Sequence, residues 1–232
     1  MFNFLKRVTV LSFLVSALAF NANAQSGISA GIGINMSEVD HTSSGLGTDG
    51  VNFTNNNFTG SQSSDDAIGL SLNVKYKFDN VLIDNLYVAP SVFFDSIGTS
   101  SVEQSGAIYS VESRHGLKFD IGYKVIDNLD AYLSFGVSVV DYQINFGDID
   151  TTAGGNVFEK ADGRNSSEII ALGVNYDISD IVDGLSVNFE YNKQSLDLAD
   201  ALLHDTQNIE SGFVVNSSTD IETFQLGVSK RF

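Results

Sequence analysis

Apolar and polar residues alternate along much of the chain, most clearly between Ile68 and Phe78. Every second residue of this segment is apolar, and the residues between them are small or charged, as in Ser71 and Lys75. Side chains of a β-strand point alternately to its two faces, so the pattern predicts a strand with one apolar and one polar face. A tilted strand of about 9–11 residues crosses a bilayer. We therefore expect the apolar face to contact lipid.

Further segments follow the same rule. They are residues 27–36, 86–95, 109–125, 131–139, 170–178, 185–192 and 224–232. Segment 86–95 is the least regular, because Tyr87 and Phe93 fall on the face that should be polar. The connections alternate in length. The short ones are Asp79–Asn85, Ile126–Leu129 and Ser179–Gly184, and the long ones are 37–66, 97–107, 143–166 and 196–219. Short turns on one side and long loops on the other are typical of outer-membrane barrels.

These patterns predict an all-β fold, an eight-stranded antiparallel up-and-down transmembrane β-barrel. Closure pairs every backbone group and removes the sheet edges that lipid could not hydrate. With eight strands both termini lie on the short-turn, periplasmic side. A soluble barrel of lipocalin type is the main alternative, and it would need its apolar face inside. The small and charged residues on the opposite face argue against it. Ten strands would result if Ser101–Val111 or a long loop held another hairpin.

The N-terminus predicts export. Lys6 and Arg7 precede a nearly unbroken apolar run from Val8 to Phe20, and Ala22-Asn23-Ala24 provides a small-x-small cleavage site. We interpret residues 1–24 as a cleaved signal peptide and residues 25–232 as one barrel domain. No later run is apolar for 18 residues, so any membrane insertion must use strands. The chain has no cysteine, which excludes a disulfide framework.

The net charge and the positions of the histidines argue against two classes of function, nucleic-acid binding and catalysis. A net charge of −17 lacks the basic footprint that nucleic-acid binding needs. His41, His115 and His204 are far apart in the sequence, and only Ser113 and His115 share a strand face. Catalysis of acyl transfer or proteolysis requires a histidine with specific nucleophilic or acidic partners. We find no such spacing and no metal-ligand cluster, and we therefore expect neither an enzyme nor a cofactor.

The polar strand faces define a charged lumen. Its predicted members are Lys75, Lys77, Asp95, Lys118, Asp120, Lys124, Asp177, Glu190 and Arg231. Both signs occur, and an eight-stranded interior is narrow enough for side chains to fill. We interpret the set as a plug of ion pairs, with a narrow water-filled path as the alternative.

A weak repeat marks the periplasmic boundary. Tyr76, Tyr123 and Tyr176 each precede a short turn in similar sequence contexts, for example Val74-Lys75-Tyr76-Lys77-Phe78. They are predicted to lie at equal depth in the aromatic girdle that such barrels carry at the interface.

The signal peptide, the alternating strands, the turn pattern and the terminal Phe232 together resemble the OmpA-like/opacity-type outer-membrane β-barrel superfamily, which includes surface antigens of α-proteobacteria. The resemblance implies a Gram-negative outer membrane, contact with its lipid and lipopolysaccharide, and recognition of Phe232 by the barrel-assembly machinery. The peptidoglycan-binding domain that follows the OmpA barrel has no counterpart here, so we expect no cell-wall tether.

Function is expected to be that of a non-enzymatic, monomeric surface barrel that supports envelope integrity or binds a host or cell-surface ligand. The candidate binding segments are the loops 37–66, 143–166 and 196–219. The alternative is a small porin-like channel for ions or small solutes. A barrel enzyme would require His115 or His204 to meet a nucleophile or a carboxylate in the fold.

Overall fold

The computed structural model describes residues 27–47, 56–63, 67–104, 107–146, 161–198, 203–204 and 212–232. The predicted signal peptide lies outside these residues. The strands are β1 Gly27–Gly47, β2 Asn56–Ser63, β3 Ala67–Lys77, β4 Leu86–Gln104, β5 Ala107–Ile126, β6 Leu129–Phe146, β7 Ala161–Asp177, β8 Leu185–Leu198, β9 Leu203–His204 and β10 Gly212–Arg231. No helix in these ranges is long and apolar enough to cross a membrane.

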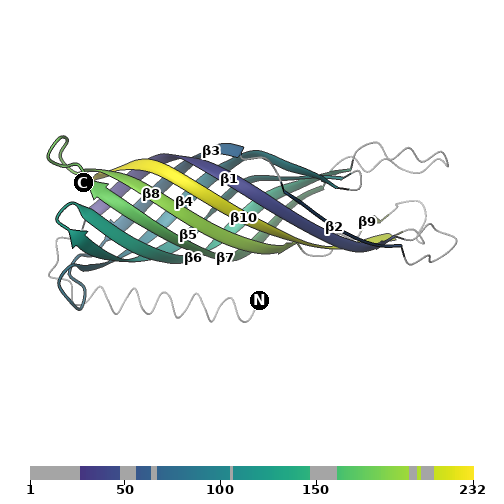
Figure 1. The fold of residues 1–232 in the computed structure, drawn as a ribbon, viewed down its shortest axis with the longest axis horizontal. Helices are drawn as coiled ribbons and strands as arrows, with labels where there is room; N and C mark the ends of the chain where they lie inside the picture. The colour runs from purple at the N-terminus through teal and green to yellow at the C-terminus, as the bar shows by residue number, and fades with distance from the viewer. Residues whose placement is uncertain are drawn as a thin grey trace.

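The strands close into an antiparallel barrel (Figure 1). Each main strand pairs with its sequence neighbour, and β1 pairs with β10 from Ser29↔Arg231 to Gly47↔Phe213. β3 pairs with residues 27–37 of β1, and β2 pairs with residues 40–47 along the same edge of β1. In the same way, β8 pairs with residues 217–230 of β10, and β9 pairs with residues 212–213. The ten strands therefore occupy eight positions, which confirms the eight-stranded prediction. Residues 101–104 and 107–111 extend β4 and β5 and add no further position.

The apolar strand faces point outward. Leu72 on β3 is 49% exposed, and Ile32 on β1 and Leu226 on β10 are similarly exposed. The alternate residues, such as Ser71 and Asn35, are buried inside. Exposed apolar residues on every side of a closed barrel form a belt that only lipid can cover. The lipocalin-type alternative, with its apolar face inside, is wrong.

Glycines inside the barrel make room for tyrosines. Tyr87 lies opposite Gly122, and Tyr132 lies opposite Gly173 on the adjacent strand. A Cβ added to Gly122 would lie 2.1 Å from Cζ of Tyr87, and one added to Gly173 would lie 2.3 Å from Cζ of Tyr132. Such distances are too short for any side chain, so these two glycines are required for the rings to lie across the lumen.

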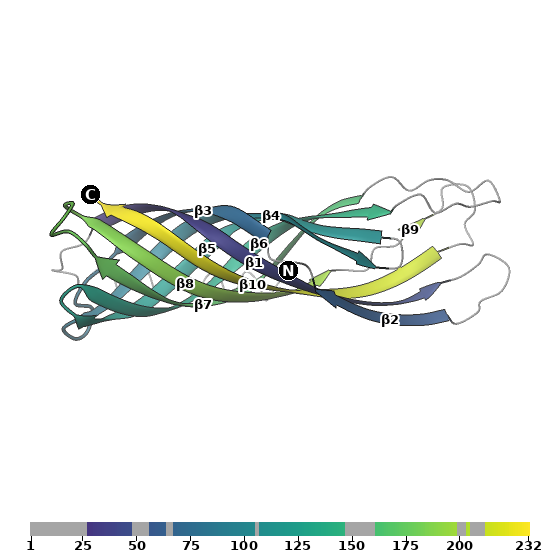
Figure 2. The ribbon, with the colours of Figure 1, turned by 45° about the horizontal axis from the view of Figure 1, so that its top comes forward.

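The long connections are shorter than predicted. Much of 37–66 and 196–219 is strand, because β1 continues to Gly47 and β10 begins at Gly212. These extensions project beyond the belt, on the side away from the C-terminus (Figures 1 and 2). There both faces of a strand can meet water, so backbone pairing persists without alternation of apolar and polar residues. The sequence pattern therefore missed them.

The wall divides above the membrane along two seams. The β3–β4 ladder extends outward only to Ser71↔Asp95, and the β7–β8 ladder only to Ile169↔Gln194. The other ladders continue, for example β4–β5 to Gln104↔Ala107. One group of extensions therefore contains β4 to β7, and the other contains β8, β10, β1 and β2. The two groups separate at the outer end in Figure 2.

Candidate functional site: a charged and sealed lumen

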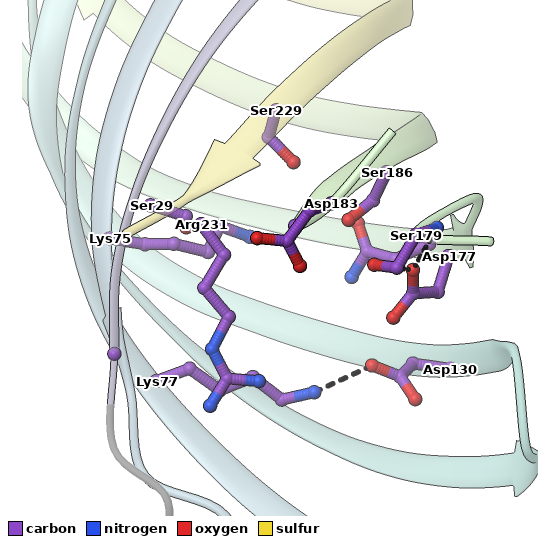
Figure 3. A pocket seen from close by; sticks show the side chains of 13 residues that line it. Ser29, Lys75, Lys77, Asp130, Asp177, Ser179, Asp183, Ser186, Ser229 and Arg231 are labelled. Atoms are coloured by element: carbon purple, nitrogen blue, oxygen red, sulfur yellow. Dashed lines mark hydrogen bonds and ion pairs between the residues drawn. The ribbon is translucent and has the colours of Figure 1, made fainter. Parts of the chain in front are cut away.

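The periplasmic end of the lumen is a polar cavity of about 250 Å³, here called the vestibule. Its charged lining comes from opposite walls (Figure 3). Lys75 and Lys77 on β3 and Arg231 on β10 supply the cations. The carboxylates are those of Asp130 on β6, Asp177 on β7 and Asp183 in the β7–β8 turn. Seryl side chains from both walls complete it.

Ion pairs cross the vestibule. Nζ of Lys77 lies 2.7 Å from Oδ2 of Asp130 and 3.3 Å from Oδ1 of Asp79, and it stacks 4.0 Å above the ring of Tyr87. Nη2 of Arg231 lies 3.3 Å from Oδ2 of Asp79. Neither acidic partner, Asp79 or Asp130, was predicted as a lumen residue. Asp130 lies on the same strand face as Tyr132 and Ser134, because the three residues are two positions apart. The alternation along β6 could therefore have identified Asp130 as a lumen residue.

A second layer of ion pairs lies deeper in the barrel. Nζ of Lys75 donates to Asp120 at 2.7 Å, and Ser134 Oγ donates to the other Asp120 oxygen at 2.6 Å. Lys118 donates to Oε1 of Glu190, whose second oxygen accepts from Tyr132 Oη at 3.0 Å. Lys118, Asp120 and Glu190 are buried. Each of the two carboxylates therefore has an opposite charge and a further hydrogen bond, and the two ammonium groups lie 5.0 Å from the ring centroids of Tyr132 and Phe93.

Arg114 forms the third charged element. Its side chain is fully buried, and Nε donates to Oδ2 of Asp95 at 2.9 Å. Ser71 Oγ donates to the other Asp95 oxygen at 2.6 Å. Nη1 and Nη2 of Arg114 have no hydrogen-bond partner within the described part of the chain. Arg114 was not predicted as a lumen residue. Its position is even-numbered, like those of Lys118 and Asp120, so all three share one face of β5.

The outer end of the lumen is closed by apolar side chains, here called the apolar seal. They are Val39, Ile97, Val111, Val140, Leu196 and Ile221, with Tyr142 packed against them. All six are buried. Three of them, Val39, Ile97 and Leu196, fall in segments that were expected to be loops, so the apolar seal was not predicted. An apolar constriction in a pore excludes water and ions.

Two predicted lumen residues lie apart from the ion pairs. Lys124 is 3.9 Å from Asp127, in the exposed β5–β6 turn. Asp177 lines the vestibule, but its Oδ1 accepts from the backbone N–H of Ser179 at 2.8 Å and from the Ser179 hydroxyl. Asp177 therefore closes the β7–β8 turn.

The tyrosines predicted for the periplasmic aromatic girdle lie on the outer face of the barrel. Tyr76, Tyr123 and Tyr176 are exposed there, and Tyr76 lies 4.6 Å from Phe78 between ring centroids. The backbone N–H of Phe232 donates to the carbonyl of Ile28 at 2.9 Å, while its ring is 78% exposed. The terminal ring is thus accessible to a partner.

The histidines do not form a catalytic arrangement among the described side chains. His41 is buried beside Thr219, at 2.9 Å from Nδ1 to Oγ1, and burial lowers the pKa of its imidazole to about 4. Nδ1 of His115 lies 3.8 Å from Oδ2 of Asp141, but Ser113 Oγ donates to that same carboxylate oxygen at 3.2 Å. A serine nucleophile must donate to the imidazole instead. The side chain of His204 is not described.

No group of three His, Cys, Asp or Glu side chains within the described ranges is arranged to hold a metal ion.

The closed wall and the lipid-facing belt define an outer-membrane β-barrel. Residues 27–232 match the family model of the OmpA-like transmembrane domain, and the chain belongs to this family. A comparison with curated proteins finds no match.

The chain is similar to several solved structures. The outer membrane protein OprG from Pseudomonas aeruginosa is 14% identical with a TM-score of 0.57, covering 91% of this chain and 98% of OprG. Ail, the attachment invasion locus protein of Yersinia pestis, solved with the heparin analogue sucrose octasulfate, is 12% identical with a TM-score of 0.48 and coverages of 89% and 99%. The outer membrane protease OmpT from Escherichia coli is 8% identical with a TM-score of 0.46 and coverages of 91% and 98%.

Proposed function

We propose that this protein is a non-enzymatic surface barrel that presents its extracellular segments to ligands outside the cell and conducts no ions. The observation that carries the proposal is the filled lumen. The ion pairs Lys75–Asp120 and Lys118–Glu190, the pair Arg114–Asp95 and the apolar seal lie between the vestibule and the outside. A solute would have to break desolvated ion pairs and then cross an apolar constriction, and both steps are costly.

The strand extensions support the display role. β1 and β10 remain paired as far as Gly47↔Phe213, well beyond the lipid-facing belt. Continuous backbone pairing makes these extensions a stiff support for the segments that join them. A barrel with a filled lumen and long strand extensions is suited to presenting such segments outside the membrane. A partner on another cell could then reach them.

Antibody labelling of intact cells tests this orientation. An epitope inserted between Gly47 and Asn56 is expected to be labelled on whole cells. The same epitope placed in the β5–β6 turn, between Ile126 and Leu129, is the matched control, and it should be labelled only after permeabilisation. Labelling of the turn on intact cells would reverse the proposed orientation and contradict the display role.

A small channel remains the second candidate, and one observation favours it. Several buried lumen atoms lack a protein partner among the described residues, including Nη1 and Nη2 of Arg114 and both side-chain polar atoms of Asn35. Buried polar groups are normally satisfied by water when protein does not reach them. A hydrated interior is the starting point for a pore.

Single-channel recording in planar bilayers separates the two candidates. The refolded barrel is expected to show no discrete conductance steps, under conditions in which a known porin does. Reproducible steps would reject the sealed lumen. In that case the residues that set charge selectivity become those of the central ion pairs, Lys75, Lys118, Asp120 and Glu190.

The hydrogen bonds of Ser113, the serine that lies near His115 in the described part of the chain, support the non-enzymatic proposal. Asp141 accepts from Ser113, and its Oδ1 also accepts from Nε of Arg164 at 2.5 Å. The carboxylate therefore neutralises an arginine and binds the serine directly. His115 has no base role toward Ser113 in this arrangement.

A further inference from the structure

The vestibule has two chemically different halves, which lie apart in Figure 3. In one half, the guanidinium of Arg231 lies on the same side as the ion pair of Lys77 with Asp130. In the other half, the carboxylates of Asp177 and Asp183 lie at the end of β7 and in the β7–β8 turn. The cations of the first half have carboxylate partners, so the two halves differ in what they can still bind.

The acidic half has carboxylate oxygens that remain available. Oδ1 of Asp177 accepts from Ser179, and its Oδ2 has no partner within the described part of the chain. The Asp183 carboxylate lines the same cavity and forms no ion pair or hydrogen bond with any described residue. Like charges that share a site disfavour one another, and an ammonium group bound beside them would offset both.

The turn that carries Asp183 is fixed against β10. The carbonyl of Gly184 accepts from the backbone N–H of Arg231 at 2.7 Å, and the carbonyl of Asp183 accepts from Nζ of Lys230. Gly184 has a φ of 67°, a left-handed conformation that glycine adopts without strain. The acidic half is therefore held in place before a ligand arrives, which lowers the entropic cost of binding.

The opposite half offers donors to an anionic group. Nη2 of Arg231 lies 3.3 Å from Asp79, which is long for a charged hydrogen bond, and a guanidinium has several further donors. Ser29 lies opposite Arg231 in the β1–β10 ladder, and Ser229 lies opposite Ser186 in the β8–β10 ladder. The hydroxyls of these three serines line the cavity and have no hydrogen-bond partner among the described residues. They can donate to one end of a ligand or accept from the other.

We propose that the vestibule binds a small zwitterion, with its ammonium group at Asp177 and Asp183 and its carboxylate at Arg231. A cavity of about 250 Å³ has the volume of about eight water molecules at about 30 Å³ each, which suits a short-chain molecule. Because the two halves lie apart, the two charges of the ligand belong at opposite ends of a short carbon chain. The site goes beyond the proposed display function, and it does not require the lumen to conduct.

Three small molecules of equal chain length test the need for both charges. They are γ-aminobutyrate, which carries both, butylamine, which carries only the ammonium, and butyrate, which carries only the carboxylate. Ligand-observed NMR titration of the folded barrel in detergent measures their affinities. Wild-type protein is expected to bind γ-aminobutyrate at least about tenfold more tightly than the other two, the effect of one additional charged hydrogen bond. No binding of γ-aminobutyrate, or equal binding of butylamine or butyrate, would overturn the proposal.

Variants locate the site. Asp183→Asn and Arg231→Gln should each weaken the binding of γ-aminobutyrate by about tenfold. Asp180→Asn, in the same turn, and Lys124→Gln, at the end of β5, are the matched controls, because neither residue lines the vestibule. Both controls should bind within about twofold of wild type.

Heat-modifiable gel migration verifies that each variant is folded. Arg231 lies on the closing strand, and if its variant does not fold, Asp183→Asn alone still decides the assignment, since the Asp183 side chain has no bond to lose among the described residues. In Asp183→Asn the preference for γ-aminobutyrate over butyrate should disappear. An unchanged preference, or equal losses in the controls, would place any binding outside the vestibule and contradict the assignment.

Discussion

Replacing Lys118 by methionine should destabilise the folded barrel by about 3–5 kcal/mol, the usual cost of removing one partner of a buried ion pair. Glu190 would remain buried, with Tyr132 and Asn192 as its described donors and with Lys75 acting on it only through longer-range attraction. The methionine side chain is similar in length to that of lysine. The loss of stability therefore measures the loss of the positive charge that compensates Glu190. Urea unfolding from lipid vesicles, followed by circular dichroism, measures it, because the chain has no tryptophan to report by fluorescence.

The double variant Lys118→Met/Glu190→Gln is the informative control. It removes both charges and keeps the acceptor for Tyr132, so it should recover most of the lost stability. Lys193→Met, which breaks the exposed pair with Glu222, should cost only about 0–1 kcal/mol. A cost for Lys118→Met as small as that would mean that the central pair is hydrated, and it would favour the channel.

Leu72→Arg is expected to cost about 2–4 kcal/mol, the range for arginine on the lipid face near the bilayer midplane. Leu72 is exposed on β3 and lies between Ile32 and Phe94 on the neighbouring strands. An arginine there must carry its charge into hydrocarbon or bend toward the headgroups. The same urea titration in vesicles measures the cost.

Leu82→Arg provides the matched comparison. Leu82 is 87% exposed in the β3–β4 turn, outside the belt, so the same change of side chain should be close to neutral. A near-zero cost for Leu72→Arg would remove Leu72 from the lipid belt and contradict the strand register on which the lumen assignment depends.

The periodicity of the sequence was sufficient for the fold class and for most of the lumen charges. In β3, each residue points opposite to its neighbours, so Lys75 and Lys77 had to share a face with Ser71 once Leu72 faced lipid. The same reasoning extends to Arg114 on β5. Lys124 and Asp177 have the same parity as the inward residues of their strands, but they lie near the ends of β5 and β7, where Asp127 and Ser179 are their partners.

The sequence by itself therefore determined that the protein is a lipid-facing barrel and which strand faces meet inside it, because side-chain direction depends only on a local period of two. Only the tertiary structure decided which charges pair, since Lys75 meets Asp120 across 45 residues and Lys118 meets Glu190 across 72. Register and closure set those contacts. They also assembled the apolar seal from six separate strands, a feature with no local signal in the sequence.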